Sequence, residues 1–109
     1  MRLENFEVAK TRFQRARGIM FRRRLSRPVL FVFARDKSLG NAIHSLFCFT
    51  RFDAIFLDRN KRVVDVMPKI APFRPFVAPR AKAKYLIEAP PGWAEEKKVE
   101  VGEKIEFSL

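Results

Sequence analysis

Short stretches with strand character recur along the whole chain and are separated mostly by turns. The clearest of them is 28–34, PVLFVFA, a continuous run of β-branched and aromatic residues that predicts a buried strand. Further stretches of this kind cover residues 3–8, 43–50, 52–57, 62–67, 84–89 and 99–107. Asp58 to Lys61 carry turn chemistry, which predicts a hairpin between 52–57 and 62–67.

Helical signals are few and short. Thr11 and Gln14 have the spacing of a capping box, which predicts a helix over 12–17 that ends at Gly18. A second helix is expected over 91–98, where Glu precedes Lys as the helix dipole favours. Four prolines in 68–80 predict an irregular connection there. Many short strands with one or two short helices predict a mainly β fold, a single-domain jelly-roll-like β-sandwich or barrel over residues 1–109.

Residue counts exclude several classes of protein. With one cysteine, Cys48, and one histidine, His44, the chain has no intramolecular disulfide and no zinc site of several thiolates. We therefore expect no metal and no cofactor. Residues 1–10 lack the apolar core of a signal peptide, and no apolar run approaches the ~20 residues of a membrane span. These features predict a cytoplasmic protein without a membrane partner.

The chain is strongly basic, with a formal net charge of +11. Residues 1–35 carry ten Lys or Arg against two Glu, and 66–84 carry five with no acid. Such a charge favours weak, non-specific association with nucleic acid, with a Kd of about 10⁻⁴–10⁻⁶ M. The residues that would form this basic face are Arg23, Arg24, Arg27, Phe73, Arg74, Phe76, Arg80, Lys82 and Lys84. No RNA-binding or zinc-finger signature accompanies them.

Four segments in this order resemble one protein family: RARGIMFRRRL (15–25), IHSLFCFTRFDAIFLDRNKRVVDV (43–66), AKYLIEAPPGW (83–93) and VGEKIEF (101–107). They are similar to the domain of unknown function 192, a group of uncharacterised proteins, over nearly the whole chain. The resemblance implies a compact jelly-roll-like β-sandwich and a biochemical role that is not established. The acidic residue of the family maps onto Asp53, and its Leu-Glu-x-Pro-x-Gly element onto Ile87, Glu88, Pro90 and Gly92. The chain departs from the family around His44, where Ser45 and Leu46 follow.

Asp53 is the most informative single residue. On a strand it shares a face with Ile55 and Leu57, so its carboxylate is expected to be buried and to need a partner. The arginines of 15–25 offer one, with Arg17 and Arg22 the best candidates for an Arg–Asp brace. A ligand-binding role for the same residues is the alternative. The predicted ligand-binding residues are Arg17, Arg22, His44, Asp53 and Glu88.

Catalytic signatures are missing from the sequence. The chain has no G-x-S-x-G element and only four glycines, too few for a glycine-rich phosphate loop. His44 and Cys48 on one strand would lie roughly 13 Å apart, too far for the base to activate the thiol. The favoured function is a non-catalytic binding module for an anionic or polar ligand or partner. Nucleic-acid association through the basic face is the alternative, and an undetected hydrolase ranks third.

Overall fold

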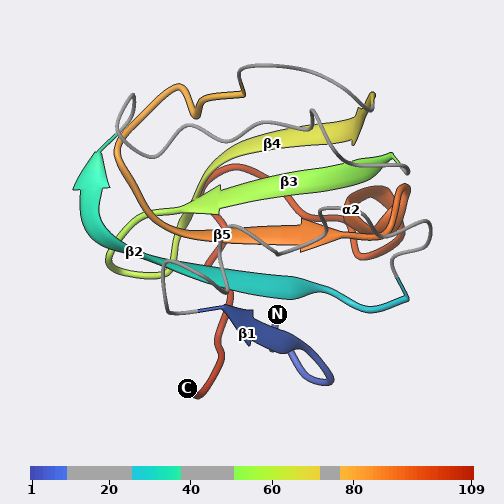
Figure 1. The fold of residues 1–109 in the computed structure, drawn as a ribbon, viewed down its shortest axis with the longest axis horizontal. Coiled ribbons are helices and arrows are strands. Elements are labelled where there is room, and N and C mark those ends of the chain that lie inside the picture. Colours follow the sequence, from blue (N-terminus) through green and yellow to red (C-terminus); the bar gives the residue numbers. More distant parts are fainter. Residues whose placement is uncertain (10–25, 38–50, 72–76) are drawn as a thin grey trace.

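The computed structural model describes residues 1–9, 26–37, 51–71 and 77–109. These residues form five strands and one short helix, in the order β1 (Glu7–Ala9), β2 (Val29–Lys37), β3 (Phe52–Leu57), β4 (Val63–Ile70), β5 (Ala83–Ala89) and α2 (Trp93–Glu96). The strands lie side by side in one sheet in the order β1-β2-β5-β3-β4 (Figure 1).

The sheet is mixed. β5 pairs antiparallel with both β2 and β3, and β3 pairs antiparallel with β4 through the turn after Leu57. β1 pairs parallel with β2 and ends the sheet on one side. β4 ends the sheet on the other side, so it is the edge strand opposite β1. All six residues of β3 are buried, as expected for a strand with neighbours on both sides.

Alternate side chains of the strands enter two separate cores, one on each face of the sheet. The Phe52 core contains Val29, Phe31, Phe33, Phe52, Ala54, Phe56, Ile70, Val77, Ala83 and Leu86. The Ile55 core contains Leu3, Leu30, Ile55, Leu57, Val63, Ile87, Ala89, Ala94, Ile105 and Phe107. Because residues of α2 and of both chain ends belong to the Ile55 core, these segments cover that face.

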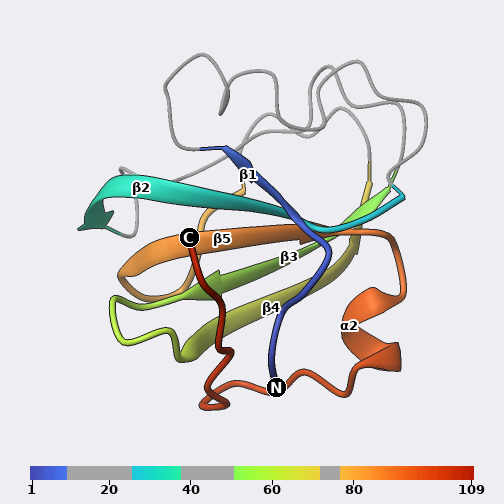
Figure 2. The same cartoon turned by 90° about the horizontal axis from the view of Figure 1, so that it is seen from below.

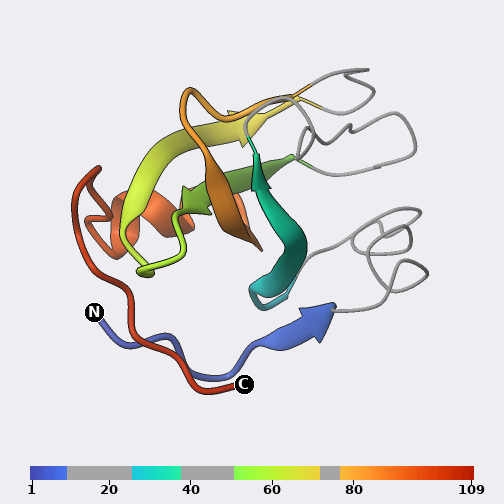
Figure 3. The same cartoon turned by 90° about the vertical axis from the view of Figure 1, so that its left-hand side faces the viewer.

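The two chain ends are joined to each other by backbone hydrogen bonds. The Leu3 amide donates to the Glu106 carbonyl at 2.7 Å, and the Glu106 amide donates to the Met1 carbonyl at 2.8 Å. The Ile105 amide donates to the Lys61 carbonyl at 2.9 Å, which ties the C-terminal segment to the hairpin between β3 and β4. Figures 2 and 3 show both ends running along the side of the sheet where α2 lies.

The mainly β prediction is confirmed, and four predicted strands are present as β2, β3, β4 and β5. Four details of the sequence prediction were wrong. The strand predicted over 3–8 begins only at Glu7, as β1. β2 continues to Lys37, beyond the predicted stretch 28–34, and β4 continues through Pro68 to Ile70. Pro68 is tolerated because β4 is an edge strand with an irregular register at this point. Residues 99–107 form single bridges, such as Arg62 with Lys104, instead of a strand.

The prediction of a jelly-roll-like sandwich or barrel is more detailed than the described residues can test. Within the described ranges there is one sheet, and neither a second packed sheet nor a closed barrel is seen. The jelly-roll arrangement and the single-domain organisation over 1–109 therefore stay predictions. The predicted strand over 43–50 and the predicted helix over 12–17 lie outside the described residues. Across the same described ranges, no helix has the length and apolar content needed to cross a membrane.

Candidate functional site

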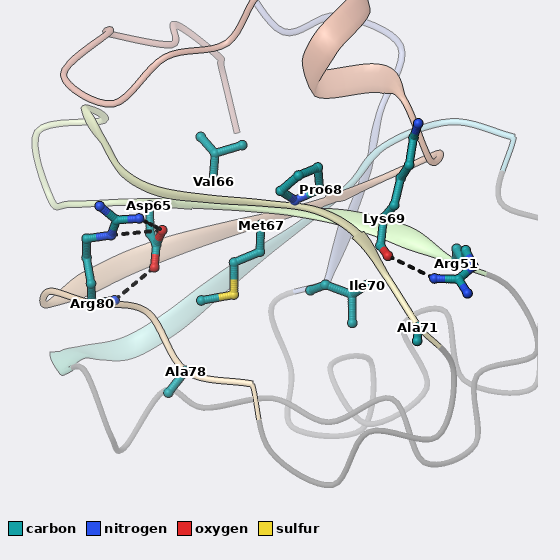
Figure 4. Close-up of a pocket in the computed structure, with 10 residues that line it drawn as sticks. All are labelled: Arg51, Asp65, Val66, Met67, Pro68, Lys69, Ile70, Ala71, Ala78 and Arg80. Atoms are coloured by element: carbon teal, nitrogen blue, oxygen red, sulfur yellow. Dashed lines mark hydrogen bonds and ion pairs between the residues drawn. The ribbon is translucent and has the colours of Figure 1, made fainter.

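A pocket of about 680 Å³ lies along the edge strand β4, between this strand and the segment that leads into β5. Its lining, drawn in Figure 4, consists of Arg51, Asp65, Val66, Met67, Pro68, Lys69, Ile70, Ala71, Ala78 and Arg80. We call it the β4 pocket. Its described lining residues combine three cations and one acid with apolar side chains.

At one end of the β4 pocket, Arg80 holds the buried carboxylate of Asp65. The Arg80 Nε and Nη2 atoms lie 3.1 and 3.0 Å from Asp65 Oδ1, and the Arg80 backbone amide donates to Oδ2 at 3.0 Å. Asp65 is 4% exposed at its side chain, whereas Arg80 is 68% exposed. A buried carboxylate needs such partners, and the exposed guanidinium provides them without being buried itself.

At the other end, Arg51 contacts the backbone of Lys69. Arg51 Nη1 donates to the Lys69 carbonyl at 3.2 Å, and the Lys69 amide donates to Asp53 Oδ1 at 2.8 Å. Lys69 has φ 50°, a left-handed conformation that is uncommon for a residue other than glycine. The register between β3 and β4 shifts here, since Phe52 pairs with Ile70 but Ala54 pairs with Met67. The extra residue makes a β-bulge, and both the amide and the carbonyl of Lys69 are hydrogen-bonded there.

Apolar side chains separate these two ends. Figure 4 shows the Met67 side chain between the Arg80–Asp65 pair and Arg51, on the same side of β4 as Ile70. Lys69 extends to the other side, so its carbonyl and not its ammonium group lies beside Arg51. The pocket can therefore offer an apolar wall with an arginine at either end.

The described residues offer no place for a metal ion, because no three His, Cys, Asp or Glu of 1–9, 26–37, 51–71 and 77–109 are grouped to hold one. The carboxylate of the β4 pocket, Asp65, already accepts hydrogen bonds from Arg80 on both oxygens. The groups available in this arrangement are guanidinium donors, which can hold a ligand through charge-assisted hydrogen bonds.

Two of the five predicted ligand-binding residues are described, and they point to opposite faces of the sheet. Asp53 lies between two residues of the Phe52 core, so its side chain enters the Ile55 side. Glu88 pairs with Ala54 and lies on the Phe52 side. Both are buried, as expected for Asp53. Arg17, Arg22 and His44 lie outside the described residues, so the cleft formed by all five stays a prediction.

Among the residues that the structure describes, the partners of Asp53 are backbone amides. Oδ1 accepts from Lys69 at 2.8 Å and from Gly92 at 3.3 Å, and Oδ2 accepts from Ala94 at 2.8 Å. These three donors come from β4 and from the start of α2. Arg17 and Arg22 lie outside the described residues, so the predicted arginine brace on Asp53 stays a prediction. The described residues do contain an arginine fork on a buried aspartate, which joins Arg80 to Asp65.

The described members of the predicted basic face lie at two ends of β5. Arg80 and Lys82 come just before β5, and Lys84 is its second residue. Arg27 precedes Val29, which pairs with Glu88 near the end of β5, about 20 Å away at the usual rise per residue. Arg27 itself contacts Asn5 at 3.3 Å and Glu7 at 3.7 Å. Arg27 is thus separated from the other described cations. Because Arg23, Arg24, Phe73, Arg74 and Phe76 lie outside the described residues, the basic face as a whole stays a prediction.

Sequence reasoning missed Asp65 and Arg51. The signal for Asp65 was available, because it stands within the apolar run 63–67 just as Asp53 stands within 52–57. The same argument about a buried carboxylate would have applied to it. Arg51 had no local signal, since its contact with Lys69 depends on the register between β3 and β4.

The family model and the relatives that match this chain all point to one protein family. The DUF192 family model, described as uncharacterized ACR, matches residues 2–107. The UPF0127 protein of Pyrococcus horikoshii is 37% identical over 100 residues, which cover 92% of this chain and 84% of that protein. The UPF0127 protein of Thermococcus sibiricus is 33% identical over 103 residues, covering 94% of this chain but 66% of that protein.

Two solved structures share the fold. A protein of unknown function from Novosphingobium aromaticivorans superposes with a TM-score of 0.84 at 21% identity, covering 94% of this chain and 74% of that one. A proposed transcription regulator from Sinorhizobium meliloti superposes with a TM-score of 0.82 at 20% identity, covering 91% and 78%. At such identities the likeness shows the fold alone.

Proposed function

We propose that this chain, which belongs to the DUF192 family of uncharacterised proteins, is a non-catalytic binding module that holds an anionic ligand in its β4 pocket. One observation carries the proposal. The pocket has an arginine at either end, and the only acid among its described lining residues is already bonded to one of them. The lining therefore has an excess of positive charge that an anion would neutralise.

The two arginines are suited to this role in different ways. Arg80 uses Nε and Nη2 on Asp65, and its remaining nitrogen, Nη1, carries two further donors. Arg51 is exposed, and its contact with the Lys69 carbonyl orients the guanidinium at the bulge. Charge-assisted hydrogen bonds from such groups are roughly twice as strong as neutral ones.

The apolar side chains between the two arginines limit which anions would fit the β4 pocket. Met67 is unbranched and adapts to irregular apolar shapes, and Ala78 adds further apolar surface beside it. A small inorganic anion would leave this surface exposed to water, whereas a carboxylate attached to an apolar chain would cover it. The ligand class that fits best is a small amphipathic carboxylate.

Nucleic-acid association is the second candidate. It is favoured by the formal net charge of +11 and agrees with the role proposed for the Sinorhizobium meliloti protein. It is disfavoured by the separation of Arg27 from Lys82 and Lys84 along β5. Binding of this kind would depend strongly on salt and little on any single residue.

The test is isothermal titration with octanoate, using 1-octanol as the uncharged probe of similar shape. We expect octanoate to bind and octanol to bind at least tenfold more weakly. Arg51→Ala should weaken octanoate about tenfold, the value of one charge-assisted hydrogen bond of about 1.4 kcal/mol. Lys82→Ala removes the same charge from an exposed site outside the β4 pocket and should leave the affinity unchanged. Equal binding of octanol, or an equal loss in Lys82→Ala, would contradict the proposal.

A further inference from the structure

A second hollow, of about 520 Å³, lies where the turn between β3 and β4 meets the two chain ends. We call it the terminal hollow. Its lining consists of Arg2, Arg59, Asn60, Lys61, Lys104, Glu106 and Phe107, none of which lines the β4 pocket. Figure 3 shows the two chain ends running together on this side of the molecule.

The terminal hollow concentrates positive charge that is scattered in the sequence. Four of its seven lining residues are cations and one, Glu106, is an acid. Residues 85–109 as a whole are acidic, with three Lys against six Glu, so the sequence gives no hint of a basic site there. The fold creates it by bringing Lys104 beside Arg2 and the hairpin turn.

The backbone beneath these cations is held in place. Asp58 Oδ1 accepts from the Asn60 amide at 2.8 Å and from the Arg62 amide at 3.0 Å, which fixes the turn. Lys61 Nζ donates to the Phe107 carbonyl at 2.8 Å and lies 4.3 Å from the centre of the Phe107 ring. Lys61 therefore ties the turn to the C-terminal segment, and its cation contacts an aromatic face.

Arg2 is oriented in a similar way by the other chain end. Its Nη2 atom donates to Ser108 Oγ at 3.1 Å, and its Nε atom lies 3.8 Å from the exposed Glu4 carboxylate. An exposed pair at that distance contributes little, so it does not compete strongly with a bound anion. The guanidinium retains donors beyond the one on Ser108.

We propose that the terminal hollow binds the phosphate group of an anion. Guanidinium forks match phosphate oxygens two at a time, and lysine ammonium groups add point charges around them. Among its described lining residues, the hollow has the Asn60 side-chain amide and only one apolar side chain, that of Phe107, so it suits a compact, highly charged group. In this it differs from the β4 pocket, whose wall is apolar. The phosphate can come from a small molecule or from a nucleic-acid strand, which share this chemistry.

The test uses pyrophosphate and, separately, a 12-nucleotide single-stranded DNA, each titrated into wild type and into Arg59→Ala/Lys104→Ala. Both residues are exposed, so the double variant should melt within two degrees of wild type. We expect it to bind the preferred probe at least tenfold more weakly. The control is Lys82→Ala/Lys97→Ala, which removes the same charge from exposed sites outside the hollow and should stay within twofold of wild type.

Two results support the proposal and identify the source of the phosphate. Pyrophosphate binding that is lost in the double variant indicates a small molecule. DNA binding that is lost in the same variant, without pyrophosphate binding, indicates a strand. Equal losses in the two double variants, or no binding of either probe, would overturn it. Octanoate binding should be unchanged in Arg59→Ala/Lys104→Ala, so this inference and the proposed function can fail separately.

Discussion

Asp53 in β3 accepts a hydrogen bond on Oδ2 from the backbone amide of Ala94, 41 residues further along the chain, at 2.8 Å. Through Oδ1 the same carboxylate accepts from Lys69 at the bulge of β4 and from Gly92 before α2. Gly92 has φ 91°, a conformation that a side chain disfavours, and at this turn the amides of Gly92 and Ala94 both donate to Asp53. One buried side chain thus fixes the bulge of the β4 pocket and the position of α2.

The first prediction concerns this carboxylate. Asp53→Ala leaves three amides near the sheet without their acceptor, and each loss costs about 1–3 kcal/mol, so the free energy of unfolding should fall by about 3 kcal/mol or more. Asp53→Asn should also destabilise, because its NH₂ group must face either Lys69 or Ala94, both of which are donors. Urea denaturation measures both changes.

The exposed Glu95→Ala variant in α2 is the control for Asp53 and should change stability by less than about 0.5 kcal/mol. An Asp53→Ala protein as stable as wild type would show that the three amide contacts contribute little.

The second prediction concerns the Asp65–Arg80 ion pair at the other end of the β4 pocket. It compares the loss of stability when each partner is replaced. Asp65→Ala should cost about 2–3 kcal/mol, because it removes the acceptor of the Arg80 amide as well as that of the guanidinium. Arg80→Ala should cost only about 1 kcal/mol. Its side chain is 68% exposed, and the backbone amide of the alanine still donates to Asp65.

Thermal and urea unfolding of Asp65→Ala, Arg80→Ala and the double variant check this asymmetry as a mutant cycle. If Arg80→Ala is the more damaging of the two single changes, the backbone contact does not hold Asp65 as proposed.

The third prediction concerns the end of α2. Lys98 has φ 55° and its amide donates to the Glu95 carbonyl at 3.1 Å, a left-handed helix end where glycine is preferred. Lys98→Gly should therefore raise the free energy of unfolding by about 0.5–1 kcal/mol. Its neighbour Lys97 has φ −85°, so Lys97→Gly should instead lower it. Both variants remove one positive charge, at adjacent positions, so a charge effect would be the same in both. If urea denaturation shows that both change the free energy of unfolding in the same direction, Lys98 does not form a left-handed helix end.

Much of the fold could be predicted from local chemistry. The apolar runs gave four strands, and the turn at Asp58 is held by its own side chain, as expected for aspartate in a turn. Burial of Asp53 followed from its apolar neighbours, and its side chain is inaccessible to solvent. These features depend on residues close together in the sequence.

The hydrogen-bond partners of Asp65 and Asp53 could not be predicted in the same way. Arg80 and Asp65 are 15 residues apart, and Asp53 and Ala94 are 41 apart, so each contact depends on strand order and register. Four prolines in 68–80 suggested an irregular segment, but an edge strand can include Pro68 because its missing N–H removes no bond within the sheet. The terminal hollow depends on the meeting of both chain ends, which no local pattern encodes.

The most direct test of the β4 pocket is a titration of ¹⁵N-labelled protein with octanoate, followed through backbone amide shifts. We predict saturable shifts concentrated at 65–71 and 78–80, around Met67, Ile70 and Arg80, and greatly reduced in Arg51→Ala. Octanol at the same concentrations should cause smaller shifts. Shifts spread over the whole basic surface, or none in these two segments, would contradict the claim that the β4 pocket binds an amphipathic anion.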